Sequence, residues 1–221
     1  MTGIGRVLAI ACLAALCGCI ASGPASGPPA ALVANSGPLA GGYQGADAGY
    51  SIVTLAAAQG TRYRSYSFYF RRRDGGGKGS IWWGQDDASD RRPLDIDDGA
   101  ERALIDIRRL PPGDYEIYNF DIVLNPPSMW QPWFAARDFA IPFTIAPGRA
   151  TYIGELKAVA LTTPGPFGNT LANGAYFVLS DKSARDLAIA RRKEPGLPAA
   201  IADEASDARA IGHELIRAGG P

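Results

Sequence analysis

The stretch Leu110–Leu124, "LPPGDYEIYNFDIVL", joins a turn signal to an alternating strand. The two prolines and Gly113 favour a tight turn, because proline fixes φ and glycine accepts conformations that other residues avoid. After the turn, Tyr115, Ile117 and Asn119 occupy alternate positions, so they share one face of an extended strand. The pattern predicts a strand that enters a core directly from a turn.

The same combination of turn and strand recurs on both sides of this stretch. Runs rich in β-branched and aromatic residues alternate with turns of Gly, Pro and Asp, a spacing typical of an antiparallel sandwich. We therefore predict a mainly β domain over residues 49–181, an antiparallel, Greek-key-like β-sandwich of about eight strands. The other runs are YSIVTLAA (50–57), RYRSYSFYFRRR (62–73), SIWWG (80–84), RALIDIRRL (102–110), two strands about the Pro147-Gly148 turn (137–161) and GAYFVLS (174–180).

Helical periodicity begins only after Ser180. Residues 180–196 place alanine and leucine at helical spacing and end in Pro-Gly, which stops a helix. Residues 197–220 place acidic residues before basic ones, the order that the helix dipole favours. The sequence therefore predicts a C-terminal helical extension over residues 182–221, made of two helices.

The N-terminus holds all three cysteines within its first nineteen residues. Arg6 precedes an apolar run, Val7–Leu16, which has the length of a signal peptide. A membrane-spanning helix needs about 20 apolar residues, so this run is too short to cross a bilayer. It ends at Leu16-Cys17-Gly18-Cys19, which resembles the bacterial lipoprotein box.

That resemblance implies cleavage before Cys19, whose thiol would receive a diacylglyceryl group. Residues 1–18 are then a lipoprotein signal peptide, and the mature chain has no free thiol. Ile20, where an Asp would favour retention in the inner membrane, points to the outer membrane, with the protein facing the periplasm. Residues 19–48 are rich in Gly, Ala, Pro and Ser and are expected to form a flexible tether.

Two segments carry a second resemblance. The segments Leu110–Ile117 and Phe143–Leu156 are similar to the turn-and-strand units of prealbumin-like sandwiches. Such sandwiches occur in carboxypeptidase regulatory-like domains and in many uncharacterised bacterial lipoproteins. The resemblance covers about residues 50–180. It implies a sandwich in which the Pro-Gly makes the turn and Tyr115 packs inside, and such domains are mostly non-catalytic.

Composition excludes several functions. The chain has 22 basic and 22 acidic residues and no basic stripe, so no nucleic-acid partner is expected. One histidine and a thiol-free mature chain leave little basis for triad or metal chemistry. No nucleotide-binding or metalloprotease motif occurs. We expect no catalytic residue, no metal site and no cofactor.

The segment Asn125–Asp138, "NPPSMWQPWFAARD", is the most unusual in the chain. Trp130 and Trp133 lie between prolines and are the candidate ligand-binding residues. Exposed indole rings can stack on sugars or enter a lipid interface, whereas buried ones fill a core. Packing over one end of the sandwich is the favoured interpretation. The Arg71–Arg73 triplet is interpreted as an ordinary solvated hairpin end.

Three functions remain. The favoured one is a lipid-anchored envelope lipoprotein, a non-enzymatic binding or structural module for a protein partner. The first alternative is a carbohydrate- or peptidoglycan-binding module that uses Trp130 and Trp133. The second is a carboxylate-dependent hydrolase, although nothing in the sequence pairs two carboxylates. A flat platform lined by Trp side chains would favour the first alternative, and an open cleft with two facing carboxylates the second.

Overall fold

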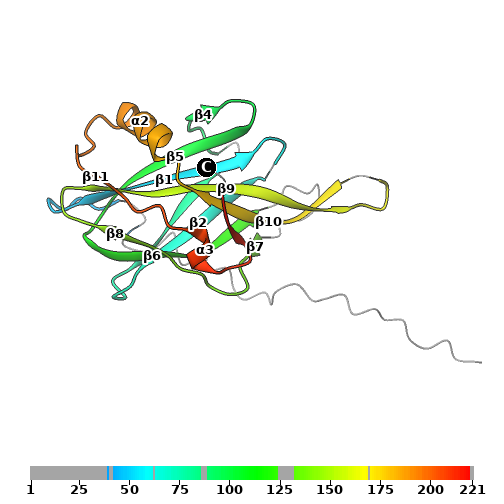
Figure 1. Cartoon of the computed structure of the whole chain (residues 1–221), viewed down its shortest axis with the longest axis horizontal. Helices are drawn as coiled ribbons and strands as arrows, with labels where there is room; N and C mark the ends of the chain where they lie inside the picture. The colour runs from blue at the N-terminus through cyan, green and yellow to red at the C-terminus, as the bar shows by residue number, and fades with distance from the viewer. Residues whose placement is uncertain are drawn as a thin grey trace, which may run out of the picture.

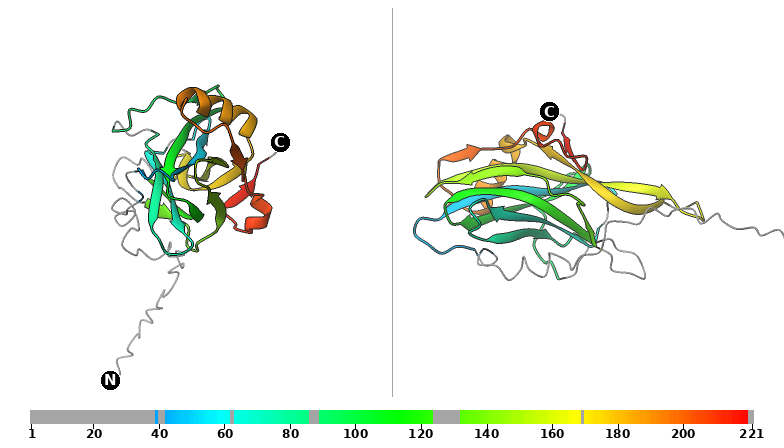
Figure 2. Two further views of the ribbon diagram at one scale, coloured as in Figure 1. Left: turned by 90° about the vertical axis from the view of Figure 1, so that its left-hand side faces the viewer. Right: turned by 90° about the horizontal axis from the view of Figure 1, so that it is seen from below.

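The computed structural model describes residue 39 and residues 42–61, 63–85, 89–123, 132–168 and 170–219, with the backbone alone at 170–173. The chain is mainly β, as predicted, and its strands form two sheets, which Figures 1 and 2 show from three sides. The predicted signal peptide and most of the predicted tether lie outside the described residues. Within the tether region, Leu39 is buried in the core and the Tyr43 N–H bonds to the Arg109 carbonyl.

The first sheet has seven strands and is mixed. The central pair is β1 and β9, which run parallel, and β10 joins β9 as an antiparallel hairpin. β11 pairs with the start of β9, before β10 takes over as its neighbour. In spatial order the strands are β12 (Ile216–Ala218), β10 (Thr170–Ser180), β9 (Ala150–Pro164), β1 (Gly49–Ala58), β5 (Glu101–Leu110) and β4 (Ile96–Asp97), with β11 (Ile201–Asp203) beside β9.

The second sheet has five strands and is antiparallel. One edge of β6 pairs with β2, and the other edge is shared by β7 and β8. The strands are β3 (Lys78–Trp83), β2 (Ser65–Arg72), β6 (Gly113–Val123), β7 (Pro132–Phe134) and β8 (Ile141–Ile145).

The main core lies between the two sheets. Phe177 of β10 has no exposed surface, and its ring centroid lies 4.6 Å from that of Phe68 and 4.7 Å from that of Phe120, both in the second sheet. Burying one such ring contributes roughly 1.5–3 kcal/mol, and edge-to-face pairs add about 0.5–1.5 kcal/mol. These aromatic contacts join the two sheets face to face.

The opening turn and strand form as predicted. Gly113 has φ of 151°, and the Tyr115 hydroxyl donates to the Pro111 carbonyl at 2.7 Å. Tyr115 and Ile117 are buried, but Asn119 is not on their face. A bulge at Tyr118 inserts one extra residue into β6 relative to β2, which shifts the alternation by one position. Phe120 therefore enters the core in place of Asn119.

Three other expectations were wrong in part. The described residues contain twelve strands, not about eight, because short strands such as β4, β7, β11 and β12 carry little sequence signal. The sandwich is not wholly antiparallel, since β1–β9, β9–β11 and β10–β12 are parallel.

Two helices follow the main strands, but only α2 (Ser183–Lys193) has the predicted extent. α3 covers Ala208–Ile211 alone, because the segments around it pair with the first sheet as β11 and β12.

Two features leave the sandwich. α2 packs on the outer face of the first sheet (Figure 1), and its Ala190 belongs to the same buried cluster as Ile52, Ile105 and Tyr152 of the sheet. The β9–β10 hairpin extends past the other strands, to the right in Figure 1, because β9 continues beyond Ala158, the last residue that pairs with β1.

Candidate functional site

The structure describes only part of the predicted site residues. Cys19 and Trp130 lie outside the described residues, so their roles stay predictions. Trp133 lies on β7 and packs, half-buried, against the main core. A Cβ placed on Gly174 would lie 3.4 Å from the Trp133 ring, so the indole covers the root of the β9–β10 hairpin. Trp133 thus contacts the core, and its role as a ligand-binding residue stays a prediction.

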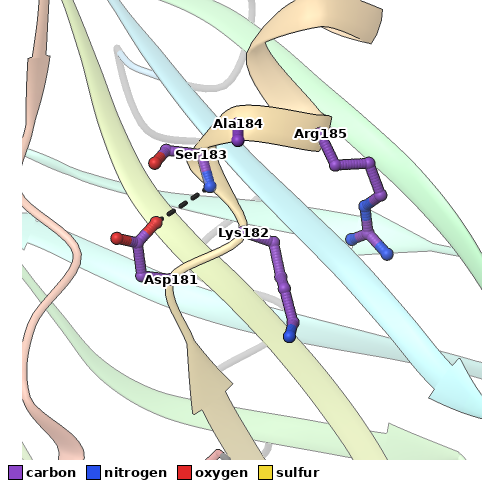
Figure 3. A pocket seen from close by; sticks show the side chains of 5 residues that line it. All are labelled: Asp181, Lys182, Ser183, Ala184 and Arg185. Carbon is purple, nitrogen blue, oxygen red and sulfur yellow. Dashed lines mark hydrogen bonds between the residues drawn. The ribbon is translucent and has the colours of Figure 1, made fainter. Parts of the chain in front are cut away.

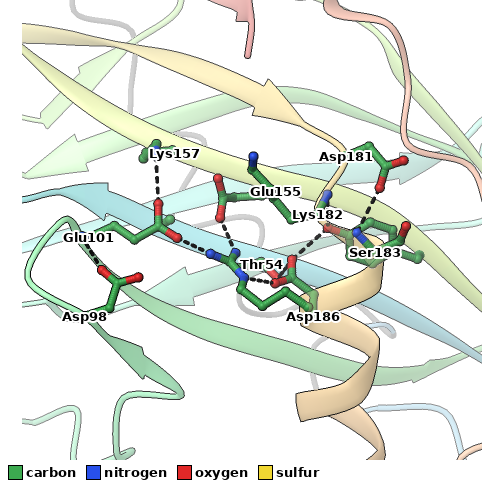
Figure 4. Close-up of polar contacts among 12 residues, drawn as sticks. Thr54, Asp98, Glu101, Glu155, Lys157, Asp181, Lys182, Ser183 and Asp186 are labelled. Carbon is green, nitrogen blue, oxygen red and sulfur yellow. Dashed lines mark hydrogen bonds and ion pairs between the residues drawn. The ribbon is translucent and has the colours of Figure 1, made fainter. Parts of the chain in front are cut away.

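A cluster of polar side chains, most of them buried, lies beneath α2, on the outer face of the first sheet (Figure 4). Sequence reasoning did not identify it. Its members come from three neighbouring strands and from the first turn of the helix. We call it the α2 cluster, and it consists of Thr54, Glu101, Tyr152, Glu155, Lys157, Arg185 and Asp186.

Strand register brings the sheet members of the α2 cluster together. Thr54 of β1 lies beside Glu155 of β9. In a regular strand, Tyr152 and Glu155 would point to opposite faces, because their separation is odd. A bulge between Tyr152 and Gly154, where Gly154 has φ of 124°, places both on the outer face. A side chain at Gly154 would also meet Leu179 at 2.9 Å, so glycine suits this position twice over.

Asp186 is the acceptor that holds α2 to the sheet. Its carboxylate has no exposed surface and accepts hydrogen bonds from the Thr54 and Tyr152 hydroxyls, each at 2.7 Å. The Nε of Arg185 donates to its other oxygen at 2.7 Å. The Tyr152 hydroxyl in turn accepts from the Lys182 N–H at 3.2 Å, so the first turn of the helix is fixed through both backbone and side chain.

Arg185 joins the other two carboxylates. Its two terminal nitrogens bond Glu101 and Glu155, while Lys157 Nζ bonds Glu101 at 2.7 Å. Glu155 is fully buried, and its Oε1 has no hydrogen-bond partner among the described residues. Three carboxyl groups thus share two cationic side chains.

The two glutamates respond to this environment in opposite directions. Burial raises the pKa of Glu155, and the neighbouring Glu101 charge adds to the shift, although the bond from Arg185 opposes it. Burial would also raise the pKa of Glu101, but hydrogen bonds from Lys157 and Arg185 outweigh it and lower that pKa. Glu155 is therefore the group in the pair that takes up a proton first as the pH falls.

The α2 cluster is closed. A pocket of about 250 Å³ lies at the first turn of α2, lined by residues 181–185 (Figure 3). Arg185 is the one residue common to the pocket and the cluster, and its side chain is 33% exposed. Glu155 and Asp186 have no exposed surface, so a substrate in the pocket would meet the guanidinium and not these carboxylates. This arrangement clamps α2 to the sheet.

The cluster does not have the composition of a metal centre, because a guanidinium occupies the space between its carboxylates. In the part of the chain that the structure describes, no group of three or more His, Cys, Asp or Glu side chains could hold a metal ion.

The tip of the β9–β10 hairpin has the opposite character. Phe167 is 92% exposed and Leu161 is 36% exposed, and they are the large hydrophobic side chains left exposed within the described ranges. Phe167 lies at the tip, whereas Leu161 lies at the root of the hairpin, where it pairs with Gly174. No Asp, Glu, Lys, Arg or His occurs from Ala158 to Ser180.

The end of the sandwich remote from this tip is rich in charge, and we call it the charged end. It comprises Arg73, Asp74, Asp114, Arg149 and Glu204. The Arg73 N–H bonds the Asp114 carbonyl at 2.9 Å, and Thr144 bonds both Asp114 and Glu204 through its hydroxyl and its N–H. The β9 strand starts here and runs about 50 Å to the hairpin tip.

No helix in the described ranges is long and apolar enough to span a membrane. No protein-family model, curated protein or solved structure matches the chain.

Sequence reasoning missed the exposed Phe167 and the α2 cluster, for different reasons. Phe167 had a readable signal, an aromatic residue between Pro166 and Gly168 in an uncharged stretch. The pairing of Glu101 with Glu155 through Arg185 had none, because it depends on strand register and on the bulge before Gly154.

Proposed function

We propose that the chain is a lipid-anchored envelope lipoprotein whose sandwich is a non-enzymatic binding or structural module for a protein partner. The lipoprotein box supports an anchor at Cys19, and Ile20 supports the outer membrane, facing the periplasm. The Tyr115 turn and the packing of two sheets support a prealbumin-like sandwich with Greek-key connections.

The observation that carries this proposal is the gathering of exposed charges of both signs at the end of the sandwich where β9 starts. The charged end gathers side chains of both signs on several turns, and Arg73 and Asp74 are each more than half exposed. Charges of both signs at a rim steer and orient a protein partner, whereas they offer little to a neutral glycan. The uncharged hairpin lies at the other end. We therefore assign the protein partner to the charged end.

The α2 cluster supports the non-enzymatic part of the proposal. A catalytic carboxylate must reach its substrate, and Glu155 and Asp186 are sealed beneath α2. Their bonds to Arg185, Thr54 and Tyr152 use the groups that a mechanism would need.

A carboxylate-dependent hydrolase is the second candidate, because one observation favours it. Glu101 and Glu155 share a guanidinium while their pKa values shift in opposite directions, which is how acid and base roles are divided between two carboxyl groups. If the chain is a hydrolase, the wild type should turn over cell-wall material, and Glu155→Gln should abolish that turnover. We expect no turnover by the wild-type chain.

Two measurements test the favoured proposal. The first is fatty-acid labelling of the full chain in bacteria, which Cys19→Ser should abolish together with membrane retention. Unchanged labelling in Cys19→Ser would contradict the anchor.

The second measurement is photocrosslinking in membranes, with the crosslinker at Asp74 or, as the matched control, at exposed Thr162 on the hairpin. We expect a discrete protein adduct from Asp74 that charge reversal at Arg149 weakens, and none from Thr162. Equal adducts from both positions would contradict the assignment of the charged end.

A further inference from the structure

The hairpin tip presents apolar groups without any rearrangement of the fold. Phe167 stands between Pro166 and Gly168 at the end of two paired strands, and its ring is 92% exposed. β9 and β10 pair as far as Pro164 and Thr170, so the backbone groups that face each other across the hairpin bond to each other. Beyond Ala158 the outer edges of these strands have no neighbouring strand among the described residues, so insertion is limited to the tip.

The absence of charge distinguishes possible partners of the tip. Protein interfaces surround their apolar centre with a polar rim, and contacts with anionic headgroups use Lys and Arg. The stretch from Ala158 to Ser180 contains no charged side chain. The exposed polar side chains near the end of β9, Thr162 and Thr163, are neutral. An apolar tip above a neutral, hydroxyl-bearing stem matches the boundary between acyl chains and headgroups.

Chain length allows a bilayer to be that partner. Between Cys19 and Leu39 the chain spans at most about 70 Å when extended, which exceeds the length of β9. A membrane that holds Cys19 is therefore within reach of the hairpin tip, wherever along the sandwich the tether joins the domain.

We propose that the tip of the β9–β10 hairpin inserts into the surface of the lipid bilayer through Phe167. This proposal rests on the proposed function, because the bilayer is the one that the anchor at Cys19 would occupy. The insertion seats the domain on the membrane by one end and turns the charged end away from it, toward a protein partner.

Insertion depth measured by spin labelling tests the proposal. The full chain, made in bacteria and reconstituted in phosphatidylcholine vesicles, would carry a nitroxide at Pro166→Cys, which leaves Phe167 in place. The matched control is Pro147→Cys, an exposed proline in the turn at the charged end. The unsubstituted chain measures any background label. Collision with oxygen and with a water-soluble nickel chelate reports whether each label is in lipid or in water.

We expect the label at residue 166 to be in lipid and the label at residue 147 to be in water. Adding Phe167→Asp should return the first label to water and leave retention on the vesicles unchanged. Because the hairpin is uncharged, high salt or added phosphatidylglycerol should leave the depth of the label unchanged.

Two results would overturn the proposal. One is a label at residue 166 that is in water while Phe167 is intact. The other is a label at residue 166 that leaves the water only when membrane proteins are added, which would make the occupant a protein. The anchor is tested separately by retention of the protein on the vesicles after a salt wash. The depth of the label is measured only on the fraction that sediments with the vesicles, so a failure of the anchor and a failure of insertion give different results.

Discussion

Glu155 and Phe167 belong to the same β-hairpin, yet each lies where its chemistry is least expected. Glu155, a carboxyl group, has no exposed surface, and Phe167, an aromatic ring, is 92% exposed. The difference shows what each contributes. The buried carboxyl groups are held by Arg185, Lys157, Thr54 and Tyr152, so they serve the fold. The Phe167 ring is almost fully exposed among the described residues, which leaves it available to a partner.

Among changes to polar side chains, the largest expected effect on stability comes from breaking the α2 cluster at its centre. Arg185→Met leaves Glu101 and Glu155 without the guanidinium that both contact. Removing one partner of a buried ion pair costs about 3–5 kcal/mol, and the partial exposure of Arg185 favours the lower end, about 3 kcal/mol. Urea unfolding followed by tryptophan fluorescence would measure this loss.

The matched control is Arg192→Met, an exposed arginine on the same helix, which should change the free energy of unfolding by less than about 0.5 kcal/mol. Equal losses in the two variants would show that the α2 cluster is not what holds the helix.

How much of the structure the sequence predicts differs from one region to another. The turn at Pro111 and the buried Tyr115 follow from local chemistry, because turn residues and alternation act within a few positions. The bulge at Tyr118 and the pairing of Arg185 with Glu155 depend on which strands become neighbours, and one sequence does not contain that information in local form. α3 shows the same limit, since acidic-to-basic order was present around it while tertiary pairing made short strands of its flanks.

The second prediction uses pH to separate the two glutamates. Glu155 has a pKa above its ordinary value of 4.5, so the folded state holds that proton more tightly than the unfolded state does. Its contribution to stability therefore grows as the pH falls through the folded pKa toward 4.5. The charged groups that face it are Arg185, Glu101 and Lys157.

Glu101 behaves in the opposite way, because its pKa is below 4.5. Its contribution is present above pH 4.5 and is lost as the pH falls through the folded pKa, below 4.5. The stability of the wild type relative to Glu155→Gln should therefore rise on acidification toward pH 4.5. Relative to Glu101→Gln, it should fall only below that pH. Parallel curves of unfolding free energy against pH for the two variants would contradict this assignment.

The smallest expected effect is at the hairpin tip, and it decides whether Phe167 belongs to the fold at all. Phe167→Ala removes a ring that is 92% exposed, so the free energy of unfolding should change by less than about 0.5 kcal/mol. The matched control is Phe177→Ala, the same substitution on the same hairpin at a ring with no exposed surface, which should cost about 3–5 kcal/mol. Circular dichroism during urea unfolding would measure both.

A loss at Phe167 comparable to that at Phe177 would mean that the tip packs against the domain, and the ring would then no longer be available to a bilayer. A neutral result would show that the exposed ring has no role in folding and leaves it free to contact a partner.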